Sequence, residues 1–230
     1  RLAQWVARRA HEVGAATTLK AVYSETGGGR VDGFSGMIER ALHTWQLSRA
    51  EVHRHLFENL PPFDERDVMR ESDARALTEW VRPTGEDATN VDGPRFEFSN
   101  RRQKWTVLAR LLWRFARRRP VVLWIDDAQW GIEALAFLKR LAQMRGDSPP
   151  VLVIATLRAD ILAEDERVAQ SVHEVRRATS SHWLEVDALD HGDQRELLDR
   201  LIPLEETLAE RLAERTEGHP LFAIQLLSHW

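Results

Sequence analysis

Two short apolar segments with an amphipathic segment between them constrain the fold of this chain most strongly. Residues 121–125 (VVLWI) and 151–157 (VLVIATL) are rich in β-branched residues. They have the uniform apolarity of strands that are buried on both faces. Residues 132–145 between them carry leucines at helical spacing. A strand, a helix and a strand of these lengths form a βαβ unit, so we predict parallel strands joined by a right-handed crossover.

Hydrophobic periodicity predicts the elements around this unit. A helix over residues 1–13 would place Leu2, Trp5, Val6 and Val13 on one face. The sequence predicts a parallel sheet with helices on both faces, and therefore an α/β fold. Everything after residue 189 is expected to be helical, with Asp190 as a helix cap. Further helices are expected over 34–47, 101–117, 190–203, 206–216 and from 220 onward, and further strands over 17–23 and 183–189.

Composition excludes several classes of protein. The 230 residues contain no cysteine, which excludes disulfides, thiolate catalysis and cysteine-bound zinc or iron–sulfur clusters. A net charge of -4 argues against a chain that binds nucleic acid over its whole surface. No apolar run approaches the roughly 18 residues of a membrane span, and no signal-peptide pattern opens the chain. We therefore expect a cytoplasmic globular protein with no membrane partner.

Charged and polar residues follow both strands of the predicted βαβ unit. Asp126 and Asp127 come directly after one strand, and Thr156 and Arg158 stand at the end of the other. Because ligands bind beyond the carboxyl ends of parallel strands, these side chains are expected on one edge. The aspartates suit a hydrated Mg²⁺ and an attacking water, and the arginine suits a phosphate. Alternatively, Asp127 caps the next helix and Arg158 pairs with an acid.

Four segments, in this order, resemble the ATPase domain of the STAND class of P-loop ATPases, which are AAA+-related and occur in large bacterial signalling proteins. The first, residues 1–15, resembles the helix that follows the phosphate loop. Residues 118–141 resemble the Walker B segment, and 151–160 resemble the next strand with its sensor arginine. Residues 216–227 resemble the Gly-x-Pro turn of the helical lid.

The resemblance implies a RecA/AAA+-like parallel sheet between helices, followed by the beginning of a lid. Residues 1–189 would form the α/β core and residues 190–230 the start of the lid. It also implies ATP and Mg²⁺ as cofactors and a role for each matching residue. Asp126 would hold Mg²⁺, Asp127 would position the water, Arg158 would sense the γ-phosphate, and Trp130, Gly218 and Pro220 would lie beside the nucleotide.

The phosphate loop itself, G-x-x-x-x-G-K-[ST], does not occur in these residues. The glycine-rich stretch 27–30 has no such lysine and follows the wrong strand, so it is expected to be a loop. The order of elements places the missing loop and its strand before Arg1. The first helix lacks a start signal and the last lacks a stop signal. We therefore expect the chain to be a piece of a longer protein.

The resulting functional hypothesis is a nucleotide-dependent switch in a multidomain regulator. Its partners would be ATP, sensor and effector domains of the same chain (a kinase, a cyclase or a DNA-binding domain) and other copies of itself. Nucleic acid would be bound only through domains outside this chain. The alternative is a scaffold with the ATPase fold that docks other proteins without hydrolysing ATP. An intact phosphate loop upstream would favour the enzyme, and its absence would favour the scaffold.

Other candidate sites are weaker. His53 and His55 are two residues apart, so they would diverge on a helix rather than share a metal. The basic residues of the helix over 101–117 could contact nucleic acid, but a solvated helix face explains them more simply.

Overall fold

Three parallel strands form the sheet of this protein in a computed structural model. The structure describes residues 1–230 apart from 28, 30–31, 86–94, 145–147, 203–204 and 229–230. Part of the expected loop at 27–30, and the expected helix end at Pro203, therefore lie outside the described residues. The chain forms two compact units, Arg1–Ser180 and Ser181–Trp230.

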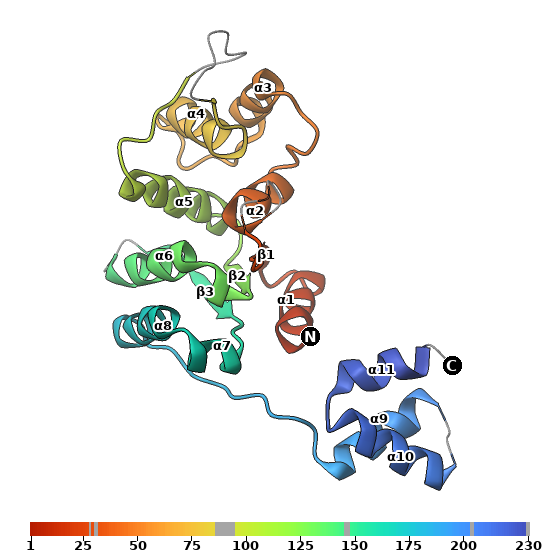
Figure 1. The fold of residues 1–230 in the computed structure, drawn as a ribbon. Coiled ribbons are helices and arrows are strands. Elements are labelled where there is room, and N and C mark those ends of the chain that lie inside the picture. Colours follow the sequence, from red (N-terminus) through yellow and green to blue (C-terminus); the bar gives the residue numbers. More distant parts are fainter. Residues whose placement is uncertain (28, 30–31, 86–94, 145–147, 203–204, 229–230) are drawn as a thin grey trace. The chain divides into compact units, whose positions relative to one another are not determined.

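The first unit contains the sheet and most of the helices (Figure 1). Its strands are β1 (Thr17–Val22), β2 (Val121–Asp126) and β3 (Val151–Ala155). Its helices are α1 (Leu2–Glu12), α2 (Gly33–Ala41), α3 (Arg49–Asn59), α4 (Arg70–Val81), α5 (Arg101–Ala116), α6 (Ile132–Gln143), α7 (Ala159–Glu164) and α8 (Glu166–Ala178), with a short 3₁₀ turn, η1 (Ala128–Trp130).

The sheet has the order β1-β2-β3, and both neighbouring pairs are parallel. Val121 lies opposite Thr17 on one side and Val151 on the other. The predicted parallel pair is confirmed, with α6 as the connection. Parallel pairing of all three strands brings their carboxyl ends to the same edge.

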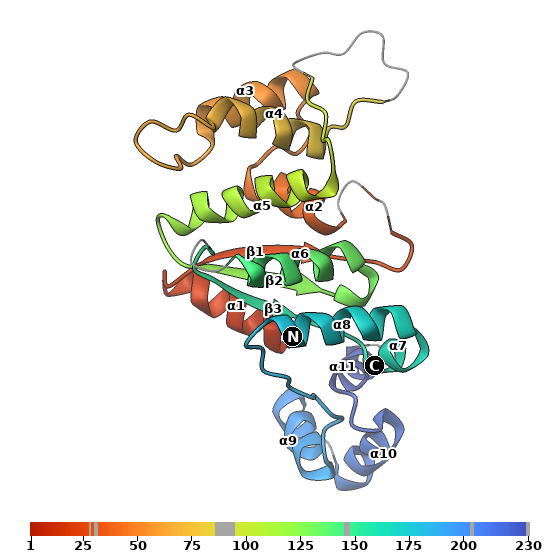
Figure 2. The same cartoon turned by 90° about the vertical axis from the view of Figure 1, so that its left-hand side faces the viewer.

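One face of the sheet carries the main hydrophobic core. Leu123 and Ile125 of β2 pack there with apolar residues of α2, α5, α6 and α8. Helix α1 packs on the opposite face, against Val122 and Trp124. Figures 1 and 2 show α1 across the sheet from α2 and α5. The prediction of helices on both faces is therefore confirmed.

Helix α1 buries a different face from the one that its large apolar residues suggest. Ala3 and Ala7 contact the sheet, whereas Leu2 and Trp5 are 65% and 66% exposed. Small side chains let the helix backbone approach the sheet closely, so the alanine stripe packs on it. Periodicity predicted the helix correctly. The face that is buried is the one whose small side chains allow a short distance between the helix and the sheet.

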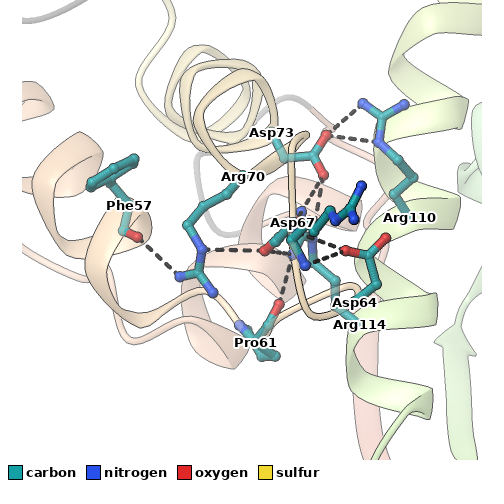
Figure 3. Close-up of polar contacts among 9 residues, drawn as sticks. Phe57, Pro61, Asp64, Asp67, Arg70, Asp73, Arg110 and Arg114 are labelled. Carbon is teal, nitrogen blue, oxygen red and sulfur yellow. Dashed lines mark hydrogen bonds and ion pairs between the residues drawn. The ribbon is translucent and has the colours of Figure 1, made fainter.

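A buried ionic cluster connects α5 with α4 and with the loop that precedes α4 (Figure 3). Arg114 of α5 is fully buried and pairs with Asp67 at 2.7 Å and with Asp73 at 2.8 Å. It also donates to the carbonyl of Pro61 at 2.8 Å, and Arg110 pairs with Asp73 at 2.5 Å. Burial alone would raise the pKa of Asp67, but the hydrogen bonds and charge of Arg114 hold that pKa below its ordinary value.

The described residues of the second unit include three helices, α9 (His191–Leu201), α10 (Glu206–Thr216) and α11 (Pro220–Ser228). They pack around Leu198 and Leu212. Asp190 accepts a hydrogen bond from the Asp193 amide at 2.8 Å, so it caps α9 as predicted. The bounds of α10 and the start of α11 at Pro220 also agree with the sequence prediction.

The predicted strand at 183–189 is wrong. This segment has no regular secondary structure, and Leu184 and Val186 are 85% and 75% exposed. A strand needs a neighbouring strand to satisfy its backbone, and none of the described strands pairs with this segment. Residues 181–189, which the sequence assigned to the α/β core, belong to the second compact unit.

Candidate functional site

The carboxyl edge of the sheet brings together the ends of β2 and β3. Asp126 is the last residue of β2, and Thr156 immediately follows β3. The Thr156 hydroxyl donates to Asp126 Oδ1 at 2.8 Å and accepts from the Asp127 amide at 3.1 Å. One threonine therefore holds the carboxylate of Asp126 and the backbone of Asp127 in place.

Asp127 lies at a strained turn just beyond this edge. Its φ and ψ are 54° and 47°, in the left-handed region that few residues other than glycine adopt. Its side chain makes no helix-cap hydrogen bond, which speaks against the capping alternative. Strain of this kind persists only where the surroundings enforce it, and it is often found at functional sites.

Gln129 helps to hold the turn at Asp127 in this conformation. The sequence analysis did not identify this residue. Its buried side chain donates to Asp127 Oδ1 at 3.1 Å and accepts from the Arg158 amide at 3.3 Å. The amide of Ala128 donates to the Thr156 carbonyl at 2.9 Å. The sequence signal for this role was a polar residue within the segment that resembles Walker B. The sequence could not identify the partners of Gln129, because they depend on how the turn folds against β3.

Arg158 lies on the surface at the same edge. It forms an exposed ion pair with Asp160, two residues further along the chain. The hydrogen bonds and charge of Asp160 raise the pKa of Arg158, and the charge of Asp127 contributes in the same direction. The alternative that Arg158 pairs with an acid therefore describes this structure. Exposed ion pairs contribute little stability, so a phosphate could take the place of Asp160.

Lys20 is a second residue that the sequence analysis left out. Its Nζ lies 3.0 Å from Asp126 Oδ2 and 3.7 Å from the centre of the Trp124 ring. Lys20 is opposite Trp124 in the strand register, and Asp126 is opposite Val22. The lysine side chain therefore extends over Trp124 to reach a carboxylate two positions further along.

Trp130 belongs to η1 and is partly buried against the main core. Next to it, Gly131 makes room for the ring of Tyr23, since a Cβ at Gly131 would lie 2.8 Å from that ring. The Tyr23 hydroxyl donates to Glu133 at 3.4 Å. Burial, and then the charge of Glu133, raise the pKa of Tyr23, so it stays protonated. This packing fixes the turn that carries Trp130 and Asp127.

Gly218 and Pro220 lie in the second unit. Gly218 has a φ of +77°, and a Cβ there would lie 2.5 Å from the Leu189 carbonyl oxygen. The Leu189 amide donates to the Gly218 carbonyl at 2.9 Å. Pro220 is exposed and begins α11. Within this unit the glycine is required by backbone packing, and the proline starts a helix whose first turn tolerates its missing N–H.

The donor atoms at the sheet edge fit a magnesium ion only in part. The carboxylates of Asp126 and Asp127 and the hydroxyl of Thr156 are the hard oxygen ligands that Mg²⁺ prefers. Among the described residues, no three His, Cys, Asp or Glu side chains gather where they could hold a metal. Mg²⁺ would thus depend on water and phosphate oxygens for most of its ligands, which is its usual mode of binding with nucleotides.

Comparisons with known proteins give no family. No family model matches the chain, and neither the curated proteins nor the solved structures contain a match. In the part of the chain that the structure describes, no helix has both the length and the apolar character needed to cross a membrane.

Proposed function

We propose that this chain is part of a signal-transduction ATPase in which MgATP acts as the switch. The observation that carries the proposal is the convergence of Asp126, Asp127, Thr156 and Arg158 on one edge of a parallel sheet. The α/β architecture with helices on both faces is compatible with a RecA/AAA+-like domain, and α9–α11 with the beginning of its lid. The proposed location is the cytoplasm.

In this proposal Asp126, oriented by Thr156, holds Mg²⁺ largely through water. The bound metal supplies positive charge to the phosphate oxygens. Asp127, held by Gln129, orients the attacking water or accepts its proton. Arg158 exchanges Asp160 for the γ-phosphate. Trp130 is the proposed neighbour of the nucleotide in the first unit.

The proposal requires a phosphate-binding loop, which the 230 residues lack. Backbone amides at a helix N-terminus and one lysine supply most of the phosphate affinity in such proteins. Calorimetry with MgATP on this chain and on a chain extended upstream of Arg1 tests the assignment. We expect poor binding by the 230 residues and much tighter binding by the extended chain. Micromolar binding by the 230 residues alone would locate the nucleotide site elsewhere.

Hydrolysis by the extended chain tests the role of Asp127. We expect Asp127→Asn to lower kcat by about 10²-fold or more, with a smaller change in the dissociation constant for ATP, because a water-positioning group acts in the transition state. Asp160→Asn serves as a matched carboxylate change at the same edge. Equal losses in binding for both aspartates, with kcat unchanged, would contradict the catalytic role.

A non-hydrolysing scaffold is the second candidate. The observation that favours it is that Lys20 and Asp160 already neutralise Asp126 and Arg158. An extended chain that binds ATP but shows no turnover, or one whose upstream sequence has no G-K-[ST], would support the scaffold.

A further inference from the structure

The carboxylate of Asp126 is engaged on both oxygens. Oδ1 accepts from the Thr156 hydroxyl at 2.8 Å, and Oδ2 pairs with Lys20 Nζ at 3.0 Å. Each of the three strands thus places one group in a row, Lys20 from β1, Asp126 from β2 and Thr156 just beyond β3. A hydroxyl oxygen can be a ligand of a metal ion, whereas an ammonium group has no lone pair and cannot. A metal ion at Oδ2 is therefore repelled by the charge of Lys20 and competes with it for this oxygen.

Lys20 is in a position to move. Its side chain is 36% exposed and that of Asp126 is 27% exposed, so solvent reaches the pair. The ammonium also lies over the Trp124 ring, at 3.7 Å from its centre. An ammonium is attracted to an indole face without any carboxylate. The ammonium group of Lys20 can therefore leave Oδ2 of Asp126 and keep a favourable position over Trp124.

We propose that Lys20 is a resident counter-ion that competes with a divalent cation for Asp126. It neutralises Asp126 while no metal is present and gives way when a cation is delivered with phosphate oxygens. The inference deepens the proposed function and rests on the metal role of Asp126. Its consequence is that the edge binds free Mg²⁺ weakly, so that the metal is accepted together with its nucleotide.

The test measures binding of Mn²⁺, used alone as the probe, by its free-ion signal in electron paramagnetic resonance. Removing the competing charge in Lys20→Met should tighten the Mn²⁺ dissociation constant by roughly fivefold, the coupling of a partly exposed charge pair. Lys20→Arg keeps the charge and should bind Mn²⁺ as weakly as the unmodified chain. Equal binding by the Lys20→Met and unmodified chains would overturn the inference.

Lys139→Met is the matched control. Lys139 also forms an ion pair with one carboxylate, Glu174, at 2.8 Å, and its side chain is 41% exposed. The two methionine variants thus change the net charge equally, at different places. Tighter Mn²⁺ binding in both would show a general charge effect and overturn the inference.

Asp126→Asn in the Lys20→Met background separates this inference from the proposed function. Loss of the added affinity in the double variant places the cation at Asp126. If the double variant binds Mn²⁺ as tightly as Lys20→Met, the metal role of Asp126 fails, and the inference fails with it. If Lys20→Met gains nothing, only the competition by Lys20 is overturned.

A second measurement uses the unmodified chain and does not depend on any variant folding. The chain has only three lysines, Lys20, Lys104 and Lys139, so reductive methylation followed by mass spectrometry can report each one separately. Added Mg²⁺ should raise the methylation rate of Lys20 relative to Lys139, because the ammonium leaves Asp126. An unchanged ratio at metal concentrations that occupy the site would overturn the inference.

Discussion

Two groups of aspartates in the first unit differ in how completely they are paired. Asp67 and Asp73 face the buried guanidinium group of Arg114, and Asp73 also pairs with the partly exposed Arg110 (Figure 3). Asp126 and Asp127 lie at the sheet edge, partly exposed, with one lysine and two neutral side chains as their partners. The carboxylates of the first group are paired with arginines away from solvent, whereas those of the second group are partly exposed to it.

This difference separates a structural role from the functional role proposed for Asp126 and Asp127. A buried carboxylate held by arginine is costly to disturb, because removing one partner leaves an unpaired charge away from water. A partly exposed carboxylate contributes less to stability and is free to exchange its partner. The following substitutions test that distinction, in order of their expected effect on the free energy of unfolding.

Arg114→Ala should have the largest effect. It leaves Asp67 and Asp73 buried without their shared cation, and breaking a buried ion pair costs about 3–5 kcal/mol. Urea unfolding followed by circular dichroism measures the loss. Arg200→Ala is the control, since Arg200 forms an exposed pair with Glu196 within α9. A loss of under about 1 kcal/mol for Arg114→Ala would place the cluster with ordinary surface ion pairs.

Acid should weaken the same cluster. The pKa of Asp67 is lower in the folded chain than in the unfolded chain, so its contribution to stability is present above the unfolded pKa, near 4. That contribution is lost as the pH falls through the lowered folded pKa. Thermal melting between pH 6 and about pH 2 measures this. Asp67→Asn should show a flatter dependence on pH, and an equal slope would contradict the assignment to Asp67.

Asp126→Ala should cost less than about 1 kcal/mol of stability, because its ion pair with Lys20 is partly exposed. In the extended chain the same change should abolish ATP hydrolysis. Melting and turnover are measured on the same preparation. Wild-type turnover by a folded Asp126→Ala chain would contradict the metal role of Asp126. A loss of stability as large as that of Arg114→Ala would contradict the distinction between the sheet-edge aspartates and the buried aspartates.

Asp160→Asn should have the smallest effect. Both Asp160 and Arg158 are exposed, so the melting temperature should not change measurably. Freeing the guanidinium of Arg158 should leave ATP binding by the extended chain unchanged or tighter. Weaker ATP binding would show that Asp160 takes part in the site instead of competing for Arg158.

The elements that the sequence predicted are those whose signals are local. Periodicity predicted the βαβ unit and α10, a capping aspartate predicted the start of α9, and Pro220 predicted the start of α11. The strand expected at 183–189 does not form, because a strand needs a neighbouring strand and none of the described strands pairs with this segment. The apolar face expected for α1 is exposed, because alanines allow closer packing than tryptophan or leucine.

For the candidate site, the sequence by itself determined that Asp126, Asp127, Thr156 and Arg158 follow two strands of a parallel pair. Those positions depend only on strand polarity and on spacing along the chain. Only the tertiary structure decided that Lys20 reaches Asp126 and that Gln129 holds Asp127. These contacts arise from strand register and from one left-handed turn. The register and the turn both depend on the packing of the whole sheet, so they cannot be predicted from a local pattern of residues.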